Sequence, residues 1–214
     1  MSDELRVQRA IVVTGEATVR RAPDLAVVAG SVSVHDPRLE DARDRANTRA
    51  SEILSAIGEL GIPDGDVVAP SLQAHPTYEH ARGRTRLTGY EATRPFSIRV
   101  RDLGLLGPLL DRLVDDGPTQ LHGTSMELDD AEAAYREALG AAVAQARGRA
   151  ELLAGAAGVI LGAALRVEEE GSAPAPFAMR GMMKAEMAAD GVPTEVAAGE
   201  VEISARVRAW FALG

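Results

Sequence analysis

The densest cluster of side chains that could bind a metal or transfer a proton lies at residues 75–80, with the sequence HPTYEH. Imidazole and carboxylate side chains this close in sequence can bind a metal ion or share a proton, so His75, Glu79 and His80 are candidate ligands. In an extended chain, however, positions 75 and 80 differ by an odd number, and their side chains point to opposite faces. We therefore interpret the segment as a strand that runs into an exposed hairpin tip, without a metal site.

Four of the six methionines lie in one segment, at Met179, Met182, Met183 and Met187. Thioethers are soft ligands that select Cu(I), but they are also flexible apolar groups, common on surfaces that adapt to partners. Residues 171–194, a loop rich in Met, Pro and Ala, hold no Cys or His that would complete a copper site. Loops of this length are usually functional or disordered. We predict that these four methionines contact a neighbouring subunit or a partner.

Paired acidic residues occur at Asp115-Asp116 and Asp129-Asp130, and three glutamates occupy 168–170. All lie at the ends of expected helices or strands, where carboxylates usually cap helices or face solvent. The sequence has neither a phosphate-binding glycine loop nor a G-x-S-x-G nucleophile elbow. Without Cys it can form no disulfide and no thiolate metal site. We predict no catalytic residue, no metal and no cofactor.

A competing interpretation is an enzyme or a small-ligand carrier whose site assembles from scattered residues such as His75, Tyr90 and Arg94. An enclosed pocket with convergent polar groups would favour that class of protein. Flat, exposed apolar patches would instead favour association with other proteins. The two interpretations are therefore distinguished by the three-dimensional structure.

Composition limits the classes of partner. The 214 residues are 46% hydrophobic and 26% charged, which is ordinary globular usage, but only 3% aromatic. The core must then consist mainly of small aliphatic side chains, which bury little area unless backbones approach closely. A net charge of −9 would repel a phosphate backbone, so we predict no nucleic-acid binding.

The N-terminal residues guide a prediction of location. The first eight residues are acidic and polar, without the basic flank and apolar core of a secretion signal. The apolar stretch at 10–13 is far shorter than the roughly 18 residues of a membrane span. We predict a cytoplasmic protein that does not insert into a membrane, with residues 1–9 as a polar extension.

Hydrophobic periodicity and turn residues define the expected elements. Pro23 and Asp24 provide turn chemistry for a hairpin between the first two strands. Asp129 and Asp130 are candidate N-caps of the longest helix. The expected strands are 10–21, 24–36, 66–79, 86–101, 119–128, 161–169 and 201–211, and the expected helices are 39–60, 103–115 and 130–157.

The resulting order is ββαββαβαββ. Hairpins mixed with helices are typical of a largely antiparallel sheet with helices on one face, which is an α+β architecture. Before residue 171 no Pro- or Ser-rich linker interrupts the chain. We therefore predict a single domain over residues 10–214.

Several short segments, in their order and spacing, resemble the SIMPL-domain family. The segments are 11–19 (IVVTGEATV), 61–62 with 66–67, 76–78, 89–92 (GYEA), 100–103, 150–154 (AELLA) and 199–203 (GEVEI). Together they cover nearly all of residues 10–213, although no single motif is catalytic.

The resemblance implies a poorly defined function. Bacterial members of the family are mostly exported envelope proteins, some linked to oxidative-stress tolerance and some assembling into homo-oligomers. Animal relatives are similar to adaptors that bind an innate-signalling kinase. The family offers no catalytic residue to carry over. We therefore expect a non-enzymatic protein that acts by homo-oligomerisation or partner binding, with a possible link to stress. This sequence departs from the common bacterial pattern because it shows no leader.

Overall fold

The computed structural model describes residues 10–81, 84–115, 119–171 and 199–214. These residues form two compact units, each with its own core. In the described part of the chain, unit 2 consists of the continuous segment Pro23–Asp129 together with Gly199. Unit 1 is assembled from the segments on either side of it, which are residues 10–22, 130–171 and 200–214. In sequence terms, unit 2 is inserted into unit 1.

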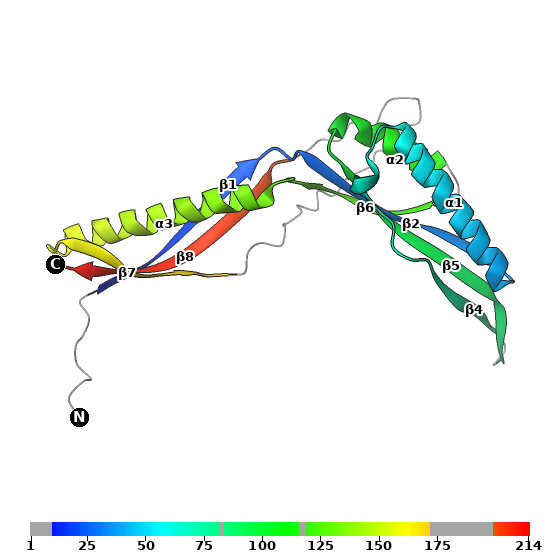
Figure 1. The fold of residues 1–214 in the computed structure, drawn as a ribbon. Coiled ribbons are helices and arrows are strands. Elements are labelled where there is room, and N and C mark those ends of the chain that lie inside the picture. The colour runs from blue at the N-terminus through cyan, green and yellow to red at the C-terminus, as the bar shows by residue number, and fades with distance from the viewer. Residues whose placement is uncertain (1–9, 82–83, 116–118, 172–198) are drawn as a thin grey trace. The chain divides into compact units, whose positions relative to one another are not determined.

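Unit 1 is a three-stranded antiparallel sheet with one long helix along one face (Figure 1). The strand order is β1 (Ala10–Arg21), β8 (Val201–Leu213), β7 (Leu161–Glu169), and the helix is α3 (Ala131–Ala156). Along β8, buried residues alternate with exposed ones from Val201 to Ala209. This alternation places one face of the sheet against α3 and leaves the other to solvent.

Small residues let α3 lie very close to the sheet. Every fourth residue of its inner side is a buried alanine, at Ala134, Ala138, Ala142, Ala146, Ala150 and Ala154. Beneath them lies Gly15 of β1, where an added Cβ would sit 2.8 Å from the backbone nitrogen of Ala146 and closer still to the carbonyl oxygen of Ala142. Position 15 therefore has room only for glycine.

Unit 2 is a five-stranded antiparallel sheet with two helices packed into its core. The sheet order is β3 (Val67–Val68), β5 (Arg84–Val100), β2 (Leu25–Asp36), β6 (Thr119–Glu127), and β4 (Gln73–Ala81) pairs with the N-terminal half of β5. The helices are α1 (Leu39–Glu59) and α2 (Leu106–Asp115), and the 3-10 turns are η1 (Asp64–Asp66) and η2 (Leu103–Leu105).

One face of the unit 2 sheet forms a core with the helices. Val28 and Val32 of β2 and Ile98 of β5 pack with Ile53 and Ile57 of α1, all at most 2% exposed. Three leucines of α2 complete this core, at Leu106, Leu109 and Leu113. Because side chains alternate along a strand, the intervening residues of β2 and β5 lie on the opposite face, which is polar.

The structure confirms the α+β class and the antiparallel sheets with helices on one face. Two predicted details are wrong. The expected hairpin of the first two strands does not form, because β1 pairs with β8 while β2 pairs with β5 and β6. The expected strand 66–79 is divided into β3 and β4. Pro70 lies in the gap, where it lacks the N–H that a ladder needs.

The remaining predictions on organisation have different outcomes. The single domain over residues 10–214 stays a prediction. The extension 1–9, and all but the first residue of the loop 171–194, lie outside the described residues. Within the described part of the chain, no helix combines the length and apolar character needed to cross a membrane.

Candidate functional site

The helix-free face of the unit 2 sheet carries the main cluster of titratable and hydroxyl groups. We call it the polar face and define it by Ser31, Ser33 and His35 of β2, His75 and Thr77 of β4, Glu91 and Thr93 of β5, and His122 of β6. The strand register places His35 opposite Glu91 on one side and His75 opposite Glu91 on the other. A carboxylate therefore lies between two imidazoles, in a row across three strands.

Hydrogen bonds organise this row. Ser33 Oγ donates to Glu91 Oε1 at 2.6 Å, and His75 Nε2 lies 3.3 Å from the other carboxylate oxygen. His35 Nε2 lies 3.0 Å from Thr77 Oγ1. On the far side of β2, His122 Nε2 is 3.0 Å from Ser31 Oγ, and Ser31 is only 3% exposed. Every imidazole of the polar face thus contacts a hydroxyl or a carboxylate.

The environment of Glu91 favours its charged form. The hydrogen bond from Ser33 is the largest influence and lowers the pKa of Glu91, while partial burial raises it; the neighbouring His75 and His35 lower it further. The net effect is a pKa below the ordinary value. Among the described residues, however, no group of three or more His, Asp or Glu side chains is arranged to hold a metal ion. The row can hold a proton between an imidazole and a carboxylate.

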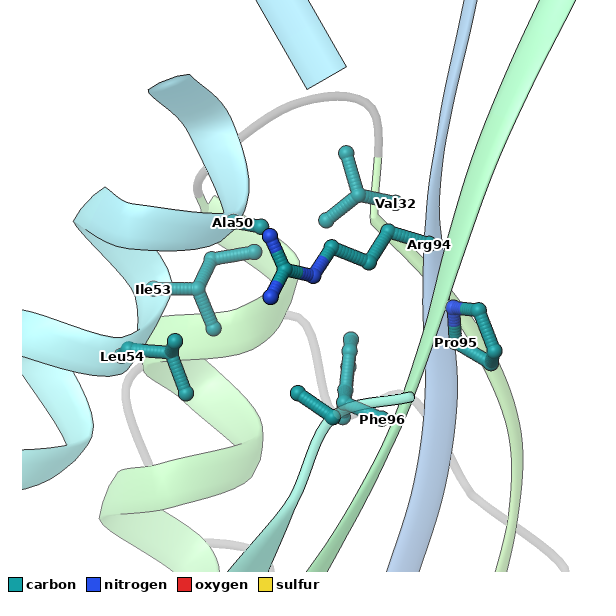
Figure 2. A pocket seen from close by; sticks show the side chains of 8 residues that line it. Val32, Ala50, Ile53, Leu54, Arg94, Pro95 and Phe96 are labelled. Atoms are coloured by element: carbon teal, nitrogen blue, oxygen red, sulfur yellow. The ribbon is translucent and has the colours of Figure 1, made fainter. Parts of the chain in front are cut away.

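A small hollow lies on the other side of the sheet, between α1 and β5 (Figure 2). Its volume is about 230 Å³, counting the open mouth, which is below the usual range of ligand pockets. Arg94 extends into it among the apolar side chains of Ala50, Ile53 and Phe96, as Figure 2 shows. Arg94 Nη1 donates to Asn47 Oδ1 at 3.2 Å, whereas its buried Nε has no hydrogen-bond partner. The hollow is too small for an ordinary organic substrate.

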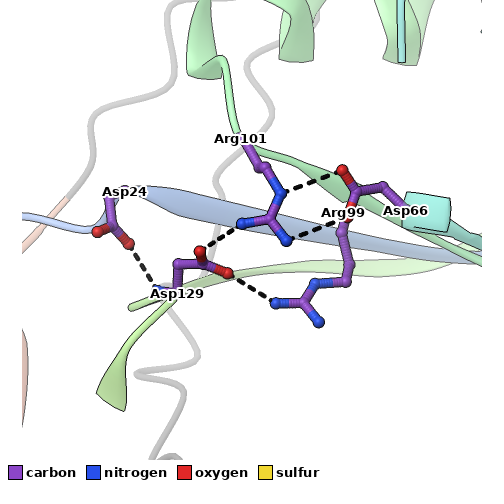
Figure 3. A network of polar contacts seen from close by, with 5 residues as sticks. All are labelled: Asp24, Asp66, Arg99, Arg101 and Asp129. Carbon is purple, nitrogen blue, oxygen red and sulfur yellow. Dashed lines mark hydrogen bonds and ion pairs between the residues drawn. The ribbon is translucent and has the colours of Figure 1, made fainter. Parts of the chain in front are cut away.

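Among the described residues of unit 2, a polar network joins two arginines to two aspartates by ion pairs and to a third aspartate by a hydrogen bond (Figure 3). Arg101 donates through Nε and Nη2 to both oxygens of Asp66, at 3.1 and 3.2 Å, and through Nη1 to Asp129. Arg99 Nη2 donates to the second oxygen of Asp129 at 2.8 Å. The hydrogen bonds to Asp66 and then Asp129 raise the pKa of Arg101. We call this network the arginine clasp.

The arginine clasp also holds the two ends of unit 2 together. The backbone N–H of Asp129 donates to Asp24 Oδ1 at 2.7 Å, and the N–H of Asp24 donates to the carbonyl oxygen of Glu127 at 3.2 Å. Asp24 is the second residue of the unit 2 segment Pro23–Asp129, and Asp129 is the last residue of that segment. The two ends of this segment are thus one hydrogen bond apart.

In unit 1, the sheet has two different edges. Side chains of α3 cap the β1 edge: Glu16 N–H donates to Gln145 Oε1 at 2.8 Å, and Arg149 Nη1 donates to the carbonyl oxygen of Thr14 at 2.6 Å. Among the described residues, the opposite edge strand, β7, pairs on one side only, with β8. It also exposes apolar side chains, since Leu165 is 53% and Val167 is 46% exposed.

On the solvent face of unit 1, cation–π contacts gather at one tryptophan. Two guanidinium groups lie near the ring of Trp210 in β8, with Arg166 at 5.1 Å and Arg208 at 5.2 Å from the ring centroid. Such cation–π contacts stabilise both partners. No carboxylate dyad or hydroxyl nucleophile is among these contacts. Trp210 and its two arginines therefore offer a surface for binding but no catalytic group.

The scattered residues of the competing interpretation do not converge. His75 lies on the polar face opposite Glu91, whereas Arg94 pairs with the core residue Val32 and Tyr90 packs against the core, which places both on the helix side. His80 lies opposite Thr85, five residues and about 17 Å along β4 from His75. The predicted contact residues Met179, Met182, Met183 and Met187 lie outside the described residues.

Sequence reasoning missed the row around Glu91 and the arginine clasp. Glu91 is 58 residues from Ser33, and Asp66 is 35 residues from Arg101. Their meeting depends on the register of strands, for which the sequence carries no local signal. The sequence indicates Asp129 only as a candidate helix cap, and it is Asp130 whose side chain accepts from the N–H of Ala133 at the start of α3.

Comparisons with known proteins agree on one family. The family model SIMPL, described as a protein of unknown function (DUF541), matches residues 11–211. The chain is 31% identical to the 26 kDa periplasmic immunogenic protein of Brucella melitensis, over 94% of this chain and 83% of that protein. It is 30% identical to the uncharacterized protein YggE of Escherichia coli K12, over 83% of this chain and 72% of that protein.

Similarity to solved structures is weak. CutA from Synechococcus elongatus aligns with 52% of this chain and 83% of its own, with a TM-score of 0.30 and 15% identity. The designed protein Foldit4 aligns with 48% of this chain at a TM-score of 0.29. These scores carry no weight for the fold.

The predicted cytoplasmic location is wrong. The finding that overturns it is the relative from Brucella, which is named as a periplasmic protein and is similar over 94% of this chain. The prediction relied on the composition of the first eight residues alone. Compartment leaves no other mark in this sequence, since a chain without cysteine has no disulfide framework to report an oxidising environment.

The resemblance noted in the sequence is thereby confirmed, because a family model covers more than nine-tenths of the chain and two bacterial proteins are similar over most of their lengths. The chain belongs to the SIMPL family, whose function is unknown.

Proposed function

We propose that this chain is a non-enzymatic assembly protein of the periplasm that acts by binding other copies of itself. The compartment follows the name of the Brucella relative. We expect no binding to nucleic acid. A role in stress stays a prediction that rests on the family resemblance.

The observation that carries the proposal is the exposure of large aliphatic side chains in unit 1. Ile160 is 77%, Leu152 is 75% and Leu165 is 53% exposed. Burying such groups stabilises an assembly by about 25 cal/mol for each Å² removed from water. The internal core of unit 1 gains little by comparison, because the inner side of α3 consists of alanines. Association would supply the burial that the chain alone does not provide.

Two features support a role without catalysis. The charged groups of the polar face satisfy one another on an open sheet surface, so they do not surround a bound substrate. The hollow at Arg94 holds about 230 Å³ with its mouth included, too little for most substrates.

Light scattering of the purified full chain tests the proposal. Size-exclusion chromatography with multi-angle light scattering at tens of micromolar should give a mass of at least two chains of 22.5 kDa each. A mass of one chain across that range would contradict self-assembly. A single-chain mass that rises only after a second protein is added would show binding to a different partner, and the proposal would then be wrong.

A further inference from the structure

The two edges of the unit 1 sheet differ in their availability for pairing. An exposed edge strand presents unpaired N–H and C=O groups that can add another strand. On β1 the outward groups of Glu16 and Thr14 are already bonded to Gln145 and Arg149 of α3. A strand from another molecule would have to break both contacts. The β1 edge is therefore closed at its centre.

In the part of the chain that the structure describes, no strand pairs with the outer side of β7, and the register identifies the backbone groups that point there. Glu170 N–H donates to the carbonyl oxygen of Arg206 in β8 at 2.9 Å. Because bonding directions alternate along an antiparallel strand, Glu168 and Arg166 also direct their backbone groups toward β8. Val167 and Glu169 then direct theirs away from β8, to the free edge.

The segment of β7 around Val167 has little protection against pairing. Natural edge strands are commonly blocked by proline, lysine or a bulge that turns the edge away. The register of β7 is irregular between Leu161 and Ala164 and between Ala164 and Arg166, but residues 166–169 pair regularly with β8 and include no proline or lysine. Val167 pairs with Ala209, so it lies on the α3 side of the sheet, yet it remains 46% exposed.

We propose that β7 pairs antiparallel with β7 of a second copy of this chain, around a two-fold axis at Val167. The inference rests on the proposed function and names its interface. The paired sheets would form one six-stranded sheet in the order β1-β8-β7-β7-β8-β1. A symmetric pair of this kind is self-complementary, as a closed dimer requires.

Charge complementarity selects the second copy as the occupant. With Val167 opposite Val167, the neighbouring residues on the solvent face are Arg166 opposite Glu168 of the second copy, and Glu168 opposite Arg166 of the second copy. In one chain Arg166 and Glu168 pair with each other. In the dimer each gains an oppositely charged cross-strand neighbour, a contact that stabilises sheets. A shift of the axis by one residue would place Arg166 against Arg166.

A single-cysteine experiment tests the pairing, because the native chain contains no Cys. Val167→Cys places two thiols across the proposed axis, with Cα atoms about 5.5 Å apart, which suits a disulfide. Val12→Cys on β1 is the matched control, since Val12 is 44% exposed, against 46% for Val167. Mild oxidation should convert most of the Val167→Cys chain to a linked dimer of twice 22.5 kDa, and leave the control largely single.

Charge reversal provides an independent measurement on the chain without cysteine. Arg166→Glu and Glu168→Arg should each cause loss of the dimer in light scattering, and the double variant should restore it. Arg20→Glu, a charge change on β1, should leave the mass of the dimer in light scattering unchanged.

The outcomes separate this proposal from the proposed function. Equal linking of the two cysteine variants in a chain that light scattering finds oligomeric would overturn the β7 interface and leave self-assembly intact. A single-chain mass throughout would overturn both. A thiol at position 167 that resists both oxidation and a soluble thiol reagent would show that this chain or another protein covers β7, and would overturn the pairing.

Discussion

Gly15 shows how one side chain, or its absence, sets the distance between two elements. An added Cβ would lie 2.8 Å from the nitrogen and 2.9 Å from the Cβ of Ala146. The contact atoms belong mainly to helix backbone, so they cannot move aside as a flexible side chain would. The close packing of α3 on β1 therefore depends on glycine at this position.

We predict that Gly15→Ala lowers the free energy of unfolding by about 3 kcal/mol, at the upper end of overpacking costs. Gly140→Ala is the control, because a Cβ at Gly140 of α3 meets nothing within 4 Å. That change should raise stability by roughly 0.5–1 kcal/mol through helix propensity. Urea unfolding of both variants measures the difference. Equal effects of the two changes would contradict the packing described for Gly15.

Glu91 gives a second prediction for a single residue, on pH dependence. Its folded pKa lies below the ordinary 4.5 of a glutamate, chiefly because Ser33 donates to it. A carboxyl group with a depressed folded pKa contributes stability that is present above the unfolded pKa. That contribution is lost as the pH falls through the folded pKa.

Ser33→Ala should therefore raise the pKa of Glu91 and reduce stability at neutral pH. The difference in unfolding free energy between variant and wild type should shrink as the pH falls below 4.5, where the Glu91 carboxyl becomes protonated in both proteins. Carboxyl NMR titration measures the pKa, and urea unfolding from pH 7 to 3 measures the stability. An unchanged pKa of Glu91 in the variant would contradict the role assigned to Ser33.

At the scale of elements, local pattern predicted positions well and partners poorly. The strand expected at 161–169 is β7 to the residue, and the strand expected at 10–21 is β1. Pro23 and Asp24, however, suggested a hairpin that does not exist, because the partner of β1 is β8, about 190 residues later in the chain. Turn residues indicate only that the chain changes direction, whereas pairing depends on which distant strands bury the same face.

The same limit applies to the candidate site, where the sequence indicates positions but not partners. His75 was identified from its neighbours in sequence, but Glu91 and Ser33 were not, since they join it only through the register of β4, β5 and β2. The division of 66–79 was equally absent from periodicity, although Pro70 was a visible signal for it. A site formed across strands needs the register before its members can be named.

The capped edge of β1 gives a prediction at this scale. Gln145→Ala removes the acceptor that holds the N–H of Glu16. We expect the amide of Glu16 to exchange with solvent faster in the variant, because an exposed amide loses its protection. The amide of Gly15, which alternation directs toward β8, should keep its rate and serves as the internal control. Hydrogen exchange followed by NMR measures both amides, and an unchanged rate at Glu16 would exclude a protective role of Gln145.

For the whole molecule, the important fact is that each unit has a core of its own. The core of unit 2 joins sheet residues such as Val28 and Ile98 to α1 and α2, and that of unit 1 joins Val207 and Phe211 to α3. A compact unit with its own core can in principle fold alone. Unit 2 has a further advantage, because all residues of its core lie within the continuous segment Pro23–Asp129.

We predict that residues 23–129 fold when they are produced alone. The fragment should show a mixed α and β circular dichroism spectrum and one cooperative thermal transition. The control fragment 37–129 lacks β2, the strand that pairs with both β5 and β6, and should show no such transition. A fragment 23–129 without cooperative unfolding would mean that unit 2 needs unit 1 for stability.

The arginine clasp has one more consequence, for the history and the engineering of this chain. Since Asp24 and Asp129 are joined by a hydrogen bond, the segment 23–129 begins and ends at almost the same point, like a cassette with a single attachment site. Such a module can be gained or lost within a host chain without stretching it, and closely spaced ends are what domain insertion tolerates. A short glycine linker from Ala22 to Asp130 should close the host, and the excised cassette should be transplantable into a surface turn of another protein.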